Sequence, residues 1–188
     1  QGDAEAAMKM CQFTVNKPGL LVMGGSQGSE AINKAVRANL DLLVKTFNVI
    51  HLCGKGKIDS SLHLDGYAQF EYINHGLSDL LAITDIALSR AGSNSIFEFL
   101  SLKIPMVLIP LSKQASRGDQ LLNAASFKKQ GFAHVIEEED LSERILIETV
   151  ERVYKDREVI IDKMNRFEEE DGLKRLYNLI ETYQLSGK

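Results

Sequence analysis

The chain has 188 residues, 44% of them hydrophobic, and a formal net charge of −4 at pH 7. This length supports one well-packed domain, and two full domains would be cramped. The negative balance does not attract polyanions, so we expect no nucleic-acid partner. We expect no transmembrane segment, because no stretch approaches the roughly 20 apolar residues that a membrane span needs. Cys11 and Cys53 form no zinc or C-x-x-C pattern, which favours a reduced, cytoplasmic setting.

The expected elements alternate along the chain. We interpret residues 1–17 as a helical lead-in or linker from a missing N-terminal domain, and residues 18–188 as the main domain with its C-terminal helices. Short apolar runs predict strands at 20–23, 48–52, 69–73, 86–88, 106–109 and 133–136. Apolar residues at helical spacing predict helices at 29–46, 78–83, 94–102 and 119–129 and from 141 onward.

This alternation is typical of an α/β fold. We predict a Rossmann-like parallel sheet of about six strands with helices on both faces, followed by a helical C-terminal tail. Ligands in such folds bind at the carboxyl ends of the strands. Each candidate motif follows a strand, so we expect the motifs to meet at one edge of the sheet.

The first candidate motif, Gly24-Gly25-Ser26-Gln27-Gly28, joins the first strand to a helix. Its glycines permit a tight turn and a close approach of the backbone, and the helix start offers free amides at the positive end of its dipole. These features suit a diphosphate, with Ser26 as an additional donor. The motif is neither a P-loop nor G-x-G-x-x-G, so a plain tight turn is an equal alternative.

The second candidate motif follows the fourth expected strand. Gly92 permits an unusual backbone angle, and Ser93, Asn94 and Ser95 crowd a helix start where capping requires only one of them. Glu98 comes about one turn later, where a carboxylate can accept two hydrogen bonds from a ribose diol. The alternative role for Glu98 is an acid in a capping box or one that complements the helix dipole.

The third candidate motif follows the fifth strand and a polar loop. Asp119 and Gln120 are expected at a helix start that faces the same cleft, and their hydrogen-bonding atoms suit sugar hydroxyls. For Asp119, simple capping of the helix is the favoured alternative. Asn123 is expected to brace the loop. His51, at the end of the second strand, is expected to be structural and not a ligand contact.

The ordered set of motifs resembles the C-terminal domain of the MurG family over roughly residues 18–155. The matching positions are residues 24–28, 89–92 with Glu98, Ile104-Pro105, Ile109-Pro110, and Asp119-Gln120 with Asn123-Ala124. That family has a GT-B fold of two Rossmann-like halves. It transfers N-acetylglucosamine from UDP-N-acetylglucosamine to a lipid-linked muramyl-pentapeptide, which gives the lipid precursor of peptidoglycan.

The resemblance implies a role for each matching position. The diphosphate would be contacted by Gly25, Ser26, Gln27 and Gly28, and the phosphate-facing helix start would be lined by Arg90, Gly92, Ser93, Asn94 and Ser95. The backbone of Ile73 would pair with uracil, and Glu98 would hold the ribose. The sugar would be recognised by Asp119 and Gln120. The acceptor site and the general base belong to the N-terminal half of the family fold. We therefore nominate no catalytic residue in this chain and expect residues 1–188 alone to be inactive.

The implied reaction is an inverting displacement in which helix amides stabilise charge on the departing diphosphate. The chain has no Asp-x-Asp motif, and we expect neither a metal nor another cofactor. The full-length protein is expected in the cytoplasm at the inner face of the cell membrane, as a peripheral enzyme of cell-wall biogenesis that supports cell shape and cell division.

Four alternatives stay open. The chain could be a MurG-like paralogue or a split subunit that uses another UDP-sugar or acceptor, a UDP-sugar epimerase, or an α/β domain without a nucleotide site. Asp119 precedes Gln120 where the family often has two glutamines, which leaves the exact sugar open.

Overall fold

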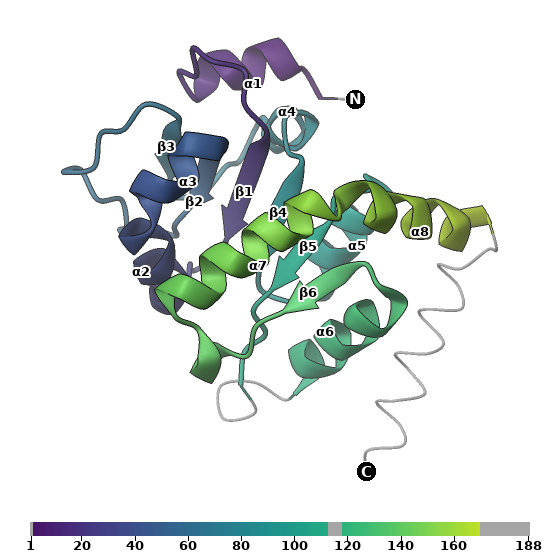
Figure 1. Ribbon diagram of the computed structural model, residues 1–188. Helices are drawn as coiled ribbons and strands as arrows, with labels where there is room; N and C mark the ends of the chain where they lie inside the picture. The colour runs from purple at the N-terminus through teal and green to yellow at the C-terminus, as the bar shows by residue number, and fades with distance from the viewer. Residues whose placement is uncertain (1, 113–117, 170–188) are drawn as a thin grey trace.

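The computed structural model describes residues 2–112 and 118–169 and has a six-stranded parallel sheet at its centre (Figure 1). The strand order is β3-β2-β1-β4-β5-β6, with every neighbouring pair parallel. The strands are β1 (Gly19–Met23), β2 (Asn48–Leu52), β3 (Tyr67–Phe70), β4 (Ile86–Ser89), β5 (Met106–Leu108) and β6 (Ala133–Val135). This arrangement confirms the expected Rossmann-like fold.

Helices cover both faces of the sheet. They are α1 (Ala4–Met10), α2 (Glu30–Ala38), α3 (Leu40–Thr46), α4 (Leu77–Ala82), α5 (Ser93–Ser101), α6 (Asp119–Gln130), α7 (Glu143–Lys155) and α8 (Arg157–Glu169), with a short 3-10 turn η1 (Glu138–Asp140) before α7. Helix α7 packs against α2 on the near face in Figure 1, and α5 lies on the far face. The side chains of β2, β4 and β5 are buried throughout, as expected for strands covered on both faces.

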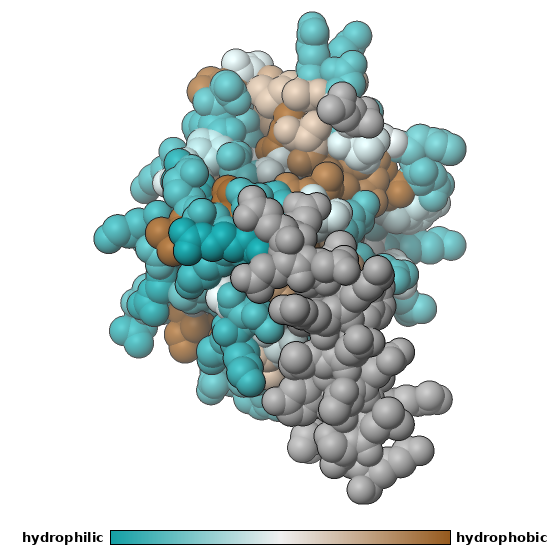
Figure 2. Space-filling model, turned by 90° about the vertical axis from the view of Figure 1, so that its right-hand side faces the viewer, coloured by the Kyte–Doolittle hydropathy of each residue, from teal (hydrophilic) through white to brown (hydrophobic). Residues whose placement is uncertain are grey.

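The face of the molecule seen in Figure 2 is mostly polar. Figure 2 shows hydrophilic side chains around a smaller apolar area on one face. No helix within residues 2–112 and 118–169 is both long enough and apolar enough to cross a membrane.

The helix expected at 29–46 is interrupted, and this expectation was wrong in that respect. Asn39 separates α2 from α3, with φ −110° and ψ 6°. Its Nδ2 donates a hydrogen bond to the carbonyl of Ala35 at 2.8 Å, so the side chain offers this carbonyl an alternative to the regular helical bond.

The third strand begins two residues and ends three residues earlier than expected, at Tyr67–Phe70 in place of 69–73. Its register pairs Val49 with Tyr67 and Leu52 with Phe70. Strand β3 is at the edge of the sheet and only its first residue is fully buried, so its apolar pattern is weak. Ile73 therefore lies beyond the strand and not within it.

The N-terminal segment packs against the rest of the domain. Helix α1 contacts α4, and Ala7, Cys11 and Phe13 are buried in the common core. The backbone NH of Asp3 also donates to Asp79 Oδ1 at 2.8 Å. The proposed division at residue 18 remains a prediction about a longer protein.

Candidate functional site

The strand order reverses between β1 and β4, and the region at the carboxyl ends of these two strands is here called the crevice. These strands are neighbours, but the chain leaves β1 toward β2 and leaves β4 toward β5, on opposite sides. Such a reversal is the usual ligand position in open α/β sheets. The first two motifs follow these two strands directly, so the structure brings them together as expected.

Residues 24–28, here called the glycine loop, make the tight turn that the sequence predicts. Gly25 and Gly28 have φ values of +87° and +70°. A Cβ at Gly28 would lie 1.9 Å from the carbonyl oxygen of Cys53, whereas one at Gly25 would meet nothing within 4 Å. Ser26 and Gln27 are exposed. One side of the loop is thus pressed against protein, and the other side is open to a ligand.

The start of α5 differs from what the sequence predicts. Gly92 has φ −71° and ψ 136°, an ordinary extended conformation, so the expected unusual angle was wrong. Gly92 is the N-cap and supplies no side-chain hydrogen bond, and Ser93, Asn94 and Ser95 occupy the first helical turn. The first amides of α5 therefore have no side-chain cap and can serve an anion.

Glu98 is exposed on α5, at the sixth helical position. The first turn of this helix contains no acidic residue, so Glu98 lies too far along to form a capping box or to complement the first turn. The structure therefore favours neither structural alternative for Glu98. Its role toward a ribose remains a prediction.

Gly118, with φ 88°, occupies the N-cap of α6, so the expectation that Asp119 caps this helix was wrong. Asp119 is exposed in the first turn, and Gln120 Oε1 accepts a hydrogen bond from the backbone NH of Leu111 at 3.1 Å. Gln120 thus connects the start of α6 to the chain after β5. The preceding residues 113–117, part of the predicted polar loop, lie outside the described residues.

Asn123 braces the start of α5, and not the polar loop as expected from the sequence. It is 1% exposed, and its Nδ2 donates to the carbonyl of Ala91 at 3.0 Å and to Ser93 Oγ at 3.3 Å. These bonds hold the start of α5 against α6. The second and third motifs are therefore parts of one packed unit.

Arg90 joins the two sides of the crevice. Its guanidinium is buried and donates to Ser29 Oγ at 2.7 Å and to the carbonyls of Ile109 and Pro110 at 3.1 and 3.4 Å, and it forms an ion pair with Glu138. Sequence reasoning missed this connecting role, and it missed Ser29. The available signal was a serine at the N-cap of the helix after the glycine loop.

His51 is a structural histidine, as expected. It is fully buried, with Nδ1 at 3.0 Å from the Tyr67 hydroxyl and Nε2 at 2.8 Å from Asn33 Oδ1. Burial, assisted by the positive charge of Arg37, lowers the pKa of His51 to about 3. Its imidazole is therefore neutral at pH 7.

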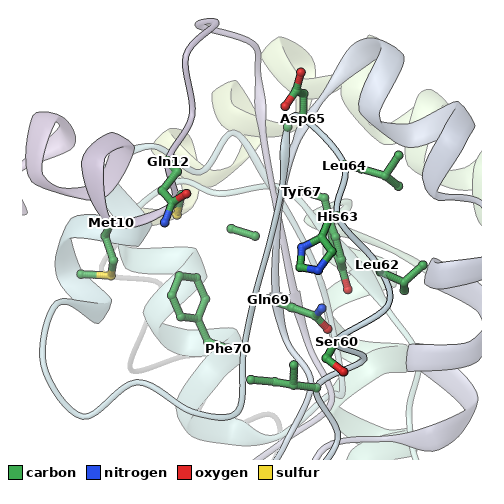
Figure 3. A pocket seen from close by; sticks show the side chains of 14 residues that line it. Met10, Gln12, Ser60, Leu62, His63, Leu64, Asp65, Tyr67, Gln69 and Phe70 are labelled. Atoms are coloured by element: carbon green, nitrogen blue, oxygen red, sulfur yellow. The ribbon is translucent and has the colours of Figure 1, made fainter.

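Ile73 is half-buried beyond β3, which is separated from β1 by β2. A nearby hollow of about 540 Å³ lies beside β3. Figure 3 shows Met10 and Phe70 on one side of it and His63 on the other. None of the predicted site residues lines this hollow, so it does not mark the predicted ligand site. Within the described ranges, no group of three or more His, Cys, Asp or Glu residues is placed to hold a metal ion.

Comparisons with curated proteins find close relatives with one shared name. The chain is 51% identical to a protein of Oceanobacillus iheyensis over 96% of its own length and 50% of the relative's, and 52% identical to one of Geobacillus kaustophilus over 96% and 51%. Both are named UDP-N-acetylglucosamine--N-acetylmuramyl-(pentapeptide) pyrophosphoryl-undecaprenol N-acetylglucosamine transferase. The chain thus spans about half the length of these relatives.

Solved structures share the fold. The crystal structure of Acinetobacter baumannii MurG has a TM-score of 0.67 at 18% identity, covering 94% of this chain and 53% of that one. The kitacinnamycin glycosyltransferase has a TM-score of 0.65 at 18% identity, covering 96% and 42%. Residues 19–179 match the family described as Glycosyltransferase family 28 C-terminal domain. Because this match covers most of the chain, the protein belongs to that family.

Proposed function

We propose that this chain is the donor-binding half of an inverting glycosyltransferase that transfers N-acetylglucosamine from UDP-N-acetylglucosamine to a lipid-linked peptidoglycan precursor. The observation that carries the proposal is the meeting of the glycine loop and the uncapped start of α5 at the reversal of the strand order. The names of the relatives, over the half that matches, supply the substrate pair.

The diphosphate occupies the crevice between β1 and β4. The open side of the glycine loop, at Gly25, Ser26 and Gln27, faces it from one strand, and the first amides of α5 face it from the other. A helix of nine residues presents the positive end of its dipole there. This site binds negative charge without a metal ion.

The remaining parts of the donor lie around the diphosphate. The carboxylate of Glu98 accepts hydrogen bonds from the ribose hydroxyls, and the backbone of Ile73 pairs with uracil. Asp119 and Gln120 contact the sugar. The Gln120 oxygen is already bonded to the NH of Leu111, so its amide nitrogen is the group directed to a sugar hydroxyl.

In the reaction, the acceptor hydroxyl oxygen bonds to the anomeric carbon while the bond from this carbon to the diphosphate oxygen breaks. The electron pair leaves with UDP, and configuration is inverted. This half stabilises the charge that grows on the diphosphate, because backbone amides are aimed at it beforehand. The base that takes the acceptor proton belongs to the other half of the enzyme, which also binds the lipid-linked acceptor at the inner face of the cytoplasmic membrane.

The epimerase alternative is weakened by His51. An epimerase needs acid–base groups near the sugar, and His51 and Asp119 are the candidates in this sequence. Both ring nitrogens of His51 are engaged with protein partners and its pKa is about 3, so it is unsuited to proton transfer at neutral pH.

Calorimetric titration with UDP-N-acetylglucosamine, UDP-glucose and UDP, without metal, tests the proposal. Saturable binding is expected, with Glu98→Ala weakening it about tenfold, because hydrogen bonds to a charged group contribute about 1.5 kcal/mol or more. Glu151→Ala, an exposed glutamate on α7, is the control and should bind like the wild type. Tighter binding of UDP-N-acetylglucosamine than of UDP-glucose supports the proposed sugar. Failure of both this chain and the full-length parent to bind any uridine nucleotide would contradict the proposal.

A further inference from the structure

A line of buried hydrogen bonds runs from the sheet edge to the glycine loop. The Tyr67 hydroxyl on β3 contacts His51 Nδ1 on β2 at 3.0 Å, and His51 Nε2 contacts Asn33 Oδ1 on α2 at 2.8 Å. Asn33 Nδ2 then donates to the carbonyl of Cys53 at 2.9 Å. His51, Asn33 and Cys53 are 0%, 3% and 0% exposed. We call these four groups the polar relay.

The direction of every bond in the relay is determined. The Cys53 carbonyl can only accept, so the amide nitrogen of Asn33 must face it and the amide oxygen must face His51. His51 Nε2 therefore carries the proton, and Nδ1 accepts from the Tyr67 hydroxyl. The low pKa of His51 agrees with a neutral ring that holds one proton.

The relay ends on the carbonyl against which the glycine loop is packed. A Cβ at Gly28 would lie 1.9 Å from the Cys53 oxygen, and one at Gly54 would lie 2.4 Å from the carbonyl oxygen of Gln27. Lys57 Nζ also donates to the Gly28 carbonyl at 3.3 Å. With no side chain in between, a small shift of the Cys53 carbonyl moves the loop backbone directly.

We propose that Asn33, His51 and Tyr67 are positioning residues, which hold the backbone of the glycine loop in place at the crevice through the Cys53 carbonyl. This inference rests on the proposed function, because it assigns the loop amides to a diphosphate. Asn33 is the central member, since it alone bonds both the histidine and the carbonyl. Substituting it frees the Cys53 carbonyl and misplaces the loop amides relative to the diphosphate.

The test is a ¹H–¹⁵N NMR titration of the chain with UDP and, separately, with uridine. In the wild type, UDP is expected to shift the amide signals of the glycine loop and of Ile73, and uridine only those of Ile73. Asn33→Ala should weaken the binding of UDP at least fivefold and abolish the shifts of the glycine-loop signals, while its affinity for uridine changes less than twofold. Tyr67→Phe removes only the far hydroxyl and should weaken UDP about twofold.

Asn48→Ala is the matched control. Asn48 is also a buried asparagine, 3% exposed, and its Nδ2 donates to the carbonyl of Val15 at 2.8 Å, at the opposite end of β2. Asn48→Ala should lower the melting temperature without changing the affinity for UDP relative to the affinity for uridine. The positioning role would be overturned if Asn33→Ala lost affinity equally for UDP and uridine, or if Asn48→Ala lost affinity for UDP but not for uridine. Absence of wild-type binding would instead overturn the proposed function.

If Asn33→Ala does not fold, His51→Ala breaks the relay in its place, and His51→Gln is the conservative comparison, because its amide can still donate to Asn33 and accept from Tyr67. A UDP-specific loss in Asn33→Ala or in a His51→Ala variant, with rescue in His51→Gln, supports the positioning role. Identical UDP binding in His51→Ala and the wild type would contradict it.

Discussion

The two sides of the crevice present backbone amides in different ways. On the β1 side, the glycine loop is fixed by direct backbone contact with Cys53 and Gly54 and needs left-handed angles. On the β4 side, α5 starts from an ordinary extended Gly92 with open space around it. The first side has no room for a Cβ at Gly28, whereas the second has open space at Gly92 and is held by the side chain of Asn123. A glycine in a motif can thus be a strict backbone requirement or a replaceable residue.

The largest expected effect compares Gly28→Ala with Gly92→Ala. An alanine at Gly28 combines φ +70° with a Cβ only 1.9 Å from the Cys53 carbonyl oxygen, so we expect a loss of about 3–4 kcal/mol of unfolding free energy. Gly92→Ala should stay within about 0.5 kcal/mol of wild type. Urea unfolding measures both, and equal losses would remove the contrast between the two sides.

Arg90→Met has the next largest expected effect, and it tests how strongly Arg90 connects the two sides of the crevice. It leaves Ser29 Oγ and the Ile109 and Pro110 carbonyls without their donor, and we expect a loss of about 2–3 kcal/mol. Arg144→Met, which breaks only an exposed ion pair with a neighbouring glutamate, should cost less than about 0.5 kcal/mol. Similar melting temperatures for the two variants would argue against Arg90 as the connection.

The pH dependence of folding stability tests His51, which supports the β1 side of the crevice through the polar relay. The pKa of His51 is about 3 when folded and about 6.5 when unfolded, so between these values the unfolded chain binds one more proton. Folding stability therefore falls as pH decreases from 6 to 4, by about 1.4 kcal/mol per pH unit from this group. His51→Gln should reduce the measured slope by this contribution, and His63→Gln, at an exposed site, should leave the slope unchanged. Chemical unfolding at three pH values gives the slopes, and a His51→Gln slope equal to wild type would contradict the assignment.

The smallest effect belongs to the β4 side. Asn123→Ala removes the bonds to the Ala91 carbonyl and Ser93 Oγ, for a loss of about 1–2 kcal/mol. Because these bonds hold the start of α5, UDP binding should also weaken, with no change in the loop signals of the unbound protein. Altered loop signals would show that the two sides are coupled more closely than the contacts indicate.

Much of the fold could be predicted because its signals are local. The apolar runs of β1, β2, β4 and β5 and the glycines of the loop specify buried strands and a tight turn from neighbouring residues alone. The edge strand β3 was misplaced by two residues at its start and three at its end, since a half-buried strand has a weaker pattern. The break at Asn39 was missed because its side chain satisfies a helical carbonyl that the apolar periodicity does not reveal.

For this protein, the sequence by itself determined the element types, the parallel sheet and the positions of the three motifs along the chain. Only the tertiary structure decided which groups meet: Arg90 with Ser29, 61 residues away, and Asn33 with His51 and Cys53, 18 and 20 residues away. A hydrogen-bond partner distant in the chain leaves no periodic signal in either segment. The physical reason is that periodicity reports which face of an element is buried, whereas polar pairing depends on how separate elements pack.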